Sequence, residues 1–267
     1  MTPPSAGLLA VLTDLTAEGD CLDSLVSAEG IDLTLPTPAP GWTIAHQLAH
    51  LSWTDELTVL ASRDPELFRT SLSGITTPEG LTEAIETGAT EGASMTTAAL
   101  LARWREARAG VLQTLAAVPP GARVVWLGRP MGAGTLASAR IMETWAHGED
   151  IADALGVRRA ATDRIRHVAD LGVRTRDHSF STHGLPVPDA PFRVELTAPS
   201  GAEWTWGPEE AEQRVTGPAL DFALLVSRRR HPDDLAVRAH GMQASKWLTI
   251  AQAFAGSPGA DPPRRSA

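Results

Sequence analysis

The sequence IMETWAHGEDIADALG, which runs from Ile141 to Gly156, has the pattern of a single helix. Its large apolar residues recur near helical spacing, and the terminal glycine suits a helix end. Glu143 and His147 stand four residues apart, so a helix places a carboxylate and an imidazole on one face, one turn apart. One helix can therefore offer two ligands to one metal ion.

A second segment offers the third ligand. The sequence GWTIAHQLAHLSWTD, from Gly41 to Asp55, carries His46 and His50 one helical turn apart. Thr43 is a suitable N-cap, and we expect a helix from this residue to about position 62. The two segments together predict a metal site between helices that are distant along the chain.

An ordinary hydrogen bond on a helix surface is the alternative, because Glu and His at this spacing also occur by chance. The apolar neighbours favour the metal site. Trp145 lies close to Glu143, and Leu51 follows His50 directly. A carboxylate in such surroundings needs a partner, since an unpaired buried charge is costly.

The composition restricts the class of protein. The chain has 267 residues, enough for one large or two modest domains, and a net charge of −9 without a basic cluster. This balance excludes a nucleic-acid-binding surface. Cys21 is the single cysteine, so no disulfide can form within the chain, and a reducing cytoplasm is expected. We expect no signal peptide and no membrane span, and either a monomer or a homodimer.

The first part of the chain is predicted to be mostly helical. Apolar periodicity predicts helices over residues 6–27, 43–62, 81–92, 97–118 and the segment that carries Glu143, with a short strand at 123–127 and a loop at 128–134. If the segment 81–92 only leads into the next helix, four long helices remain. The metal candidates then lie on the second and the fourth.

The second part changes character after a further helix at 162–176. Proline is frequent from 183 to 191, which predicts a linker. The following pattern predicts a hairpin of strands at 192–197 and 202–207, a strand at 211–216, a helix at 218–229, a strand at 234–240 and a helix at 244–254. The expected domains are 1–183, helical, and 184–258, small and α+β, with a disordered tail at 259–267.

These segments resemble a known family. WTIAHQLAHL from Trp42, followed much later by ETWAHGEDI from Glu143, is similar to the metal-binding bundle of the DinB superfamily. The arrangement more closely resembles the mycothiol-dependent maleylpyruvate isomerase branch, in an actinobacterial subfamily. The resemblance implies an up-down four-helix bundle followed by a small α+β domain, and covers most of the chain.

The resemblance also implies a ligand set. In that branch the metal, usually zinc, is held by one histidine of the second helix and a Glu-x-x-x-His pair on the fourth, which correspond to His50, Glu143 and His147. Many superfamily members have a histidine where Glu143 stands. Three protein ligands plus water form an open zinc site suited to catalysis. Nickel or iron also suits these ligand types.

Other residues are candidates for catalysis or binding. His46 is a candidate base, an alternative ligand or a histidine that packs on the helix flank. Asp150, one turn beyond His147, is a candidate catalytic residue or a solvated carboxylate at a helix end. Arg229 is a candidate catalytic residue, and Arg228 and Arg230 are candidates for cofactor binding, because guanidinium groups bind anions in a bidentate fashion. The alternative for all three arginines is a solvated helix end.

The expected function is that of a metal-dependent enzyme. The resemblance implies that the metal would lower the pKa of an external thiol, mycothiol, for isomerisation or thiol transfer on a small electrophilic substrate. A second hypothesis is a hydratase or cyclase type of enzyme that needs a metal but no thiol. A third is a metal-dependent binding protein without turnover, since fold does not fix function.

Overall fold

The computed structural model describes residues 4–127, 129–254, 256 and 262–264. It divides into an N-terminal unit, Met1–Arg159, and a C-terminal unit, Ala160–Ala267. The boundary therefore falls before the predicted one at residue 183. The predicted tail at 259–267 lies largely outside the described residues.

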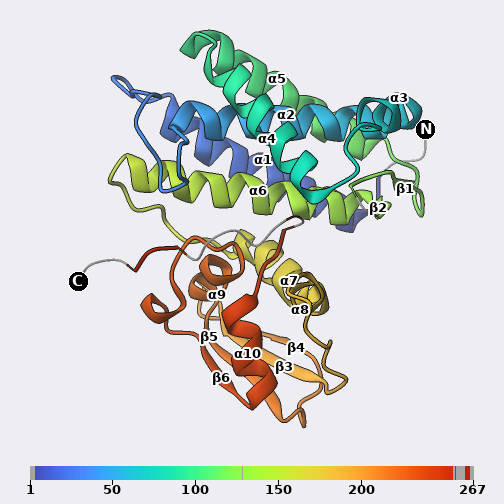
Figure 1. The fold of residues 1–267 in the computed structure, drawn as a ribbon, viewed down its shortest axis with the longest axis vertical. Coiled ribbons are helices and arrows are strands. Elements are labelled where there is room, and N and C mark those ends of the chain that lie inside the picture. The colour runs from blue at the N-terminus through green and yellow to red at the C-terminus, as the bar shows by residue number, and fades with distance from the viewer. Residues whose placement is uncertain (1–3, 128, 255, 257–261, 265–267) are drawn as a thin grey trace. The chain divides into compact units, whose positions relative to one another are not determined.

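The N-terminal unit is helical apart from one small two-stranded sheet (Figure 1). Its elements are α1 (Ala6–Val26), α2 (Ile44–Arg63), α3 (Pro65–Ser71), α4 (Pro78–Ala93), α5 (Thr97–Ala116), β1 (Arg123–Val124), β2 (Met131–Gly132) and α6 (Ala133–Ala154). Four of these are the long helices predicted at 6–27, 43–62, 97–118 and around Glu143. Side chains cap the starts of α1, α3, α4 and α5, and Thr43 is the N-cap of α2 as predicted.

Two local predictions for this unit need correction. The helix predicted at 81–92 is present, but it has 16 residues, starts earlier at Pro78 after the cap residue Thr77, and is therefore more than a lead-in to the next helix. The strand predicted at 123–127 is reduced to two residues, which pair with β2 inside the segment predicted as a loop. Within the described ranges, every helix is too short or too polar to cross a bilayer.

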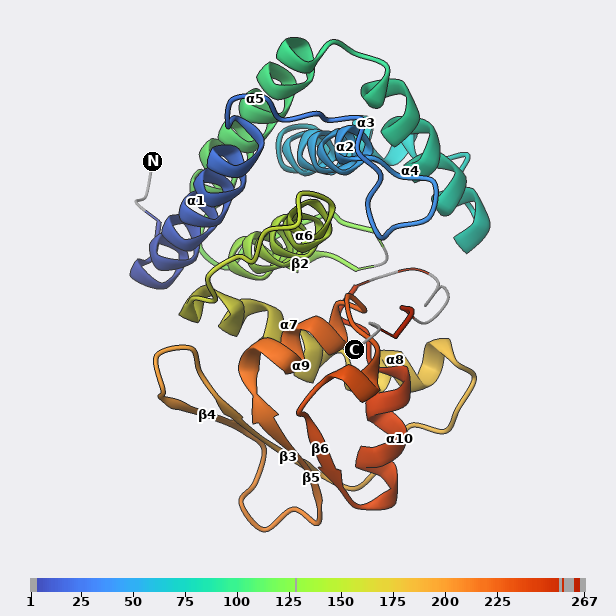
Figure 2. The same cartoon turned by 90° about the vertical axis from the view of Figure 1, so that its left-hand side faces the viewer.

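Helices α2 and α6 pack against each other in the middle of the unit, with α1 and α5 on one side and α4 on the other (Figure 2). Two apolar clusters fill the interior. One cluster includes Leu57 and Ile141, and the other includes Leu51 and Ile151. Along the sequence, α2 passes from the second cluster to the first, whereas α6 passes from the first to the second. The two helices are therefore antiparallel.

A polar layer links α2 and α6 within this apolar interior. It contains three cross-helix pairs, which are Gln47 with His147, His50 with Glu143, and Asp55 with Arg140. Residue numbers rise along α2 as they fall along α6, which agrees with antiparallel packing. Buried polar side chains are costly unless paired, so this layer is a candidate functional site.

Helix α4 approaches α2 closely because residue 92 is glycine. A Cβ atom at Gly92 would lie 2.6 Å from the Cβ of Ala49, closer than two carbons can approach. We expect Gly92→Ala to destabilise the protein by about 1–3 kcal/mol through overpacking. Gly134, also helical, has open space around it, so Gly134→Ala should stabilise by about 0.5–1 kcal/mol. Urea unfolding would measure the change in the free energy of unfolding for each variant. If both variants were stabilised or both destabilised, the close approach at residue 92 would be contradicted.

The C-terminal unit combines short helices with one four-stranded sheet. Its elements are the 3₁₀ helix Asp163–Ile165, α7 (Arg166–Arg174), α8 (Arg176–Thr182), β3 (Phe192–Thr197), β4 (Glu203–Trp206), β5 (Gln213–Pro218), α9 (Ala219–Val226), a second 3₁₀ helix Pro232–Asp234, β6 (Arg238–His240) and α10 (Met242–Ile250). The strand order is β4-β3-β5-β6, with β3 and β5 parallel and the other pairs antiparallel.

Helices α9 and α10 pack against the sheet and bury its apolar face (Figure 2). Alternate residues of β3 are buried, and Trp247 of α10 is fully buried with its ring edge-on to Phe192 and Phe222. The predicted hairpin is confirmed, with Leu196 opposite Trp204. The chain thus has a mixed helical and sheet fold.

The helix predicted at 162–176 is wrong in extent. It begins as a 3₁₀ turn, is interrupted at Thr175 and continues as α8 to Thr182. The Thr175 hydroxyl hydrogen-bonds to the carbonyl of Gln252, far away in the sequence. Because α7 also packs against α9, this helical stretch belongs to the C-terminal unit, which explains the earlier domain boundary. The strand predicted at 234–240 is also shorter, since β6 covers Arg238–His240 and Asp234 belongs to the second 3₁₀ helix.

Candidate metal centre

Three side chains of the polar layer converge on one point. His50 comes from α2, and Glu143 and His147 come from α6. One ligand atom of each lies within 4.8 Å of the others. The Nε2 atoms of His50 and His147 lie 3.4 Å and 3.2 Å from Oε2 of Glu143. The structure thus brings together the three residues for which the sequence predicted ligation.

The surroundings keep the carboxylate of Glu143 ionised. Burial alone would raise its pKa, but hydrogen bonds and electrostatic attraction from His147 and His50 hold that pKa well below the ordinary value of 4.5. An ionised carboxylate is the form that binds a metal. The donor set, two imidazoles and one carboxylate, is one that zinc enzymes use with a fourth position open.

The spacing of the three atoms fits a metal ion. Metal–ligand bonds of about 2.0–2.2 Å in a tetrahedron place ligand atoms about 3.4 Å apart. The two contacts to Glu143 at 3.2 Å and 3.4 Å agree with this separation. A carboxylate oxygen that faces two imidazole nitrogens needs a proton or a metal ion between them, because lone pairs on both sides repel.

Acid pH is expected to destabilise the metal-free protein through Glu143. Since the pKa of this carboxyl is lower in the folded than in the unfolded chain, its contribution is complete above the ordinary value of 4.5. The contribution is lost as the pH falls through the folded-state pKa. Urea unfolding from about pH 6 to pH 3 should show the stability difference between wild type and Glu143→Gln shrinking. A constant difference would contradict this sign.

Trp42, directly before the N-cap of α2, forms one wall of the centre. Its ring is stacked on the imidazole of His147 at 6.1 Å between centroids and lies 5.4 Å from that of His50. Its indole nitrogen donates to Glu86 of α4 at 2.9 Å, which fixes the ring in place. Trp42 therefore covers the two imidazoles from one side.

The structure places His46 beside this cluster rather than in it. Its Nδ1 lies 3.2 Å from the backbone nitrogen and 2.8 Å from the hydroxyl of Thr43, so this ring nitrogen helps to cap α2. Its ring stacks on Trp42 at 6.3 Å. Asp150 is buried on α6, one turn beyond His147.

The three predicted arginines follow α9 in the C-terminal unit and are half-buried. Arg228 has a φ of 56°, the single positive φ among the described residues other than glycine. Two side chains bond to nearby backbone, with Arg229 donating to the carbonyl of Ser227 and Arg230 to that of Arg229. The role of these arginines remains a prediction.

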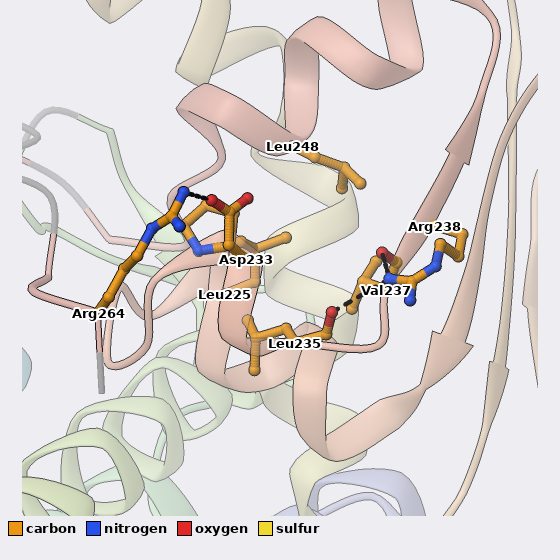
Figure 3. A pocket seen from close by; sticks show the side chains of 8 residues that line it. Leu225, Asp233, Leu235, Val237, Arg238, Leu248 and Arg264 are labelled. Carbon is orange, nitrogen blue, oxygen red and sulfur yellow. Dashed lines mark hydrogen bonds and ion pairs between the residues drawn. The ribbon is translucent and has the colours of Figure 1, made fainter. Parts of the chain in front are cut away.

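A pocket of about 520 Å³ lies in the C-terminal unit, and Figure 3 shows the side chains that line it. Leucine and valine side chains line it together with Asp233, Arg238 and Arg264, and Arg264 pairs with Asp233. The guanidinium of Arg238 donates to the carbonyls of Leu235 and Val237, so backbone acceptors already engage it. None of the site residues predicted from the sequence lines this pocket, and the ligand cluster of the polar layer is the stronger candidate for chemistry.

Two residues of the centre were not singled out from the sequence. Trp42 contacts the imidazoles, and Gln47 bonds to Nδ1 of His147. Gln47 stands three residues before His50, which places both on one face of α2. That spacing is the signal in the sequence that could have indicated it.

The fold and this cluster define a class, that of helical proteins with a His–Glu–His centre followed by an α+β unit. Residues 15–152, more than half of the chain, match the family described as "Mycothiol maleylpyruvate isomerase N-terminal domain". The chain belongs to this family, as the resemblance in the sequence predicted. Residues 188–240 match a second family, described as "Wyosine base formation".

The relatives agree with this assignment. An uncharacterized protein of Mycobacterium tuberculosis, found in two strains, is 51% identical over 250 residues, which cover 93% of this chain and 96% of the relative. Two crystal structures of mycothiol-dependent maleylpyruvate isomerase, one of them of a histidine-to-alanine mutant, share the fold with TM-scores of 0.56 and 0.59. Both are 18% identical and cover 87% of this chain and 92% of their own.

Proposed function

We propose that this protein is a metal-dependent enzyme that uses mycothiol to isomerise, or to transfer the thiol to, a small electrophilic substrate of the maleylpyruvate type. The observation that carries the proposal is the convergence of one ligand atom each from His50, Glu143 and His147 within 4.8 Å. Family membership supports the thiol and the reaction type. Zinc suits the ligand set best, and nickel or iron is the alternative.

Each component of the proposed centre has a separate role in the reaction. When bound, the metal supplies a Lewis acid that keeps a coordinated thiol deprotonated. Glu143 supplies one negative charge to the centre, and the ring of Trp42 covers the two imidazoles from one side. Cys21 is exposed on α1 and lies outside the ligand cluster, so the reacting thiol comes from a separate molecule. His46 and Asp150 are the proposed groups for moving protons near the centre.

The finer features of the fold belong to the same proposal. Helices α1, α2, α5 and α6 would form the up-down four-helix bundle of the DinB type, with α4 as an addition. The protein would act in the cytoplasm as a monomer or homodimer. A single cysteine and the thiol cosubstrate both suit a reducing compartment.

The arginines at 228–230 are proposed to bind anionic groups of the substrate or thiol. Arg228 occupies the C′ position of α9, where glycine is the usual residue. Its backbone N–H and that of the following residue donate to carbonyls of α9. Keeping arginine at a φ of 56° costs stability, which suggests that the guanidinium is needed.

Arg228→Gly should therefore raise stability while it impairs function. We expect a gain of up to about 1 kcal/mol from relief of strain. The KM for an anionic substrate should rise by about tenfold, the effect of one charge-assisted hydrogen bond. Urea unfolding and steady-state kinetics would measure the two effects, and a KM equal to that of wild type would remove Arg228 from the binding site.

The decisive experiment combines metal analysis with thiol dependence. Purified protein should contain about one metal ion per chain and isomerise maleylpyruvate when mycothiol is added. After cobalt substitution, mycothiol should produce a sulfur-to-cobalt charge-transfer band. Activity that persists without thiol would replace the proposal with a hydratase or cyclase type of enzyme. A metal that binds neither thiol nor substrate would indicate a binding protein instead.

A further inference from the structure

The amide of Gln47 links one proposed ligand to a fixed acceptor in the backbone. Its Oε1 contacts Nδ1 of His147, and its Nε2 lies 2.9 Å from the hydroxyl of Thr37. That hydroxyl in turn donates to the carbonyl of Trp42 at 3.0 Å. Gln47 is fully buried, so water does not compete for either end of its amide.

The direction of this hydrogen-bond chain follows from its last member. A backbone carbonyl can only accept, so the hydroxyl of Thr37 donates to Trp42 and its lone pair accepts from the amide nitrogen of Gln47. The oxygen of Gln47 then faces His147 and must accept, which puts the proton of the imidazole on Nδ1. With the Nδ1 proton fixed in this way, Nε2, which lies 3.2 Å from Oε2 of Glu143, is the nitrogen available to a metal ion placed between them.

The loop that carries Thr37 is held firmly against the start of α2. Its backbone nitrogen donates to the carbonyl of Trp42 at 2.8 Å, and Ile44 and Ala45 donate to the carbonyls of Leu35 and Leu33. Thr37 is therefore a fixed point for the amide of Gln47.

His50 has no equivalent support. Its Nδ1 is buried and lacks a hydrogen-bond partner among the described residues. Metal-binding histidines usually donate their second N–H to an acceptor, which fixes the ring and its tautomer. Of the two imidazoles, only His147 receives that support among the described residues, and it comes from Gln47.

We propose that Gln47, held in orientation by Thr37, is a positioning residue that fixes the metal-binding tautomer of His147. This inference rests on the proposed metal centre and adds two residues to it. Gln47 touches neither metal nor substrate in this scheme. Its effect is on the affinity and geometry of the centre.

Zinc affinity of purified variants, measured by competition with a chelator, tests the proposal. Gln47→Leu removes the acceptor at similar size and should weaken zinc binding by about 10–100-fold. Gln47→Glu keeps an acceptor toward Nδ1 and should stay within a few-fold of wild type. Ser52→Ala is the matched control, because this hydroxyl is buried on the same helix and bonds only to the carbonyl of Leu48. It should leave zinc affinity unchanged.

A double-mutant cycle separates positioning from packing. Thr37→Val removes the hydroxyl that orients the amide, so it should weaken zinc binding several-fold in the wild-type background. In the Gln47→Glu background it should have no effect, since a carboxylate presents an oxygen to His147 in either orientation. A purely structural role of Thr37 would give the same loss in both backgrounds and overturn the proposal.

The outcomes also separate this inference from the proposed function. If wild type binds no zinc, nickel or iron, the metal centre itself fails. If wild type binds zinc and Gln47→Leu binds it equally well, only the positioning role fails. The absorption spectrum of the cobalt-substituted protein gives a second readout, because a misoriented imidazole changes the ligand geometry in Gln47→Leu but not in Ser52→Ala.

Discussion

Replacing Glu143 by glutamine is expected to reduce zinc affinity by more than about 100-fold and to lower kcat/KM by at least as much, because loss of a residue that only orients a ligand already costs about 10–100-fold. Glutamine has nearly the same size, so the packing of α2 against α6 should survive. The change removes the negative charge whose pKa is held low by His147 and His50. Two neutral imidazoles alone hold a divalent cation weakly, because one of three ligands and the only ligand charge are lost. Equilibrium zinc competition and isomerase kinetics would measure the two effects.

Glu86→Gln is the matched control for this variant. Glu86 is an exposed carboxylate whose oxygen accepts from the indole of Trp42, and a glutamine oxygen can accept the same bond. The same chemical change should leave zinc affinity within a few-fold of wild type. If both variants bind zinc equally well, the charge at residue 143 has no special role and the proposed ligand set is wrong.

The sequence was most informative where function depends on local spacing. Glu143 and His147 are one turn apart on one helix, and helical periodicity around them is strong, so their common face could be predicted. The place of His50 came from the pattern around it and from the family resemblance. Local spacing could not predict which side chains of α2 contact which side chains of α6. That Gln47 faces His147 depends on the register of α2 against α6, which no local pattern encodes.

The errors in the fold have the same origin. Thr175 lies within a helical pattern, but its hydroxyl bonds to Gln252, a contact that exists only in the folded chain. The predicted boundary at residue 183 followed from the proline-rich segment, which is a loop within the C-terminal unit. The proline content correctly predicted a loop at 183–191. It could not show that the helices before this loop belong to the C-terminal unit.

The pair of Asp55 and Arg140 should produce the largest change in stability. Nε of Arg140 donates to Asp55 at 2.7 Å, and only 2% and 4% of the two residues' surfaces are exposed. Arg140→Met removes the guanidinium and leaves a buried carboxyl without its partner. Breaking a buried ion pair from one side costs about 3–5 kcal/mol. We therefore expect a loss of this size in the free energy of unfolding at neutral pH.

The pH dependence of this loss provides a second check. Burial raises the pKa of Asp55, and the attraction of Arg140 offsets part of that rise. Without Arg140 the pKa should rise further, and the carboxyl takes up a proton in the folded state. A raised pKa of an acid costs stability as the pH rises from the unfolded value of about 3.9 toward the folded value. Arg140→Met should therefore be less destabilised near pH 5 than near pH 8.

The double variant Asp55→Leu with Arg140→Met distinguishes two causes of the lost stability, an unpaired buried charge and the missing packing of the arginine side chain. Apolar replacement of both members of a buried pair is often neutral or stabilising, so this variant should recover most of the loss in Arg140→Met. Chemical denaturation of the single and double variants at pH 8 measures the coupling. If the double variant is as unstable as Arg140→Met, the loss arises from packing of the long arginine side chain and not from an unpaired buried charge. Recovery of stability with unchanged zinc affinity would show that the pair supports the fold beside the metal centre and is separable from it.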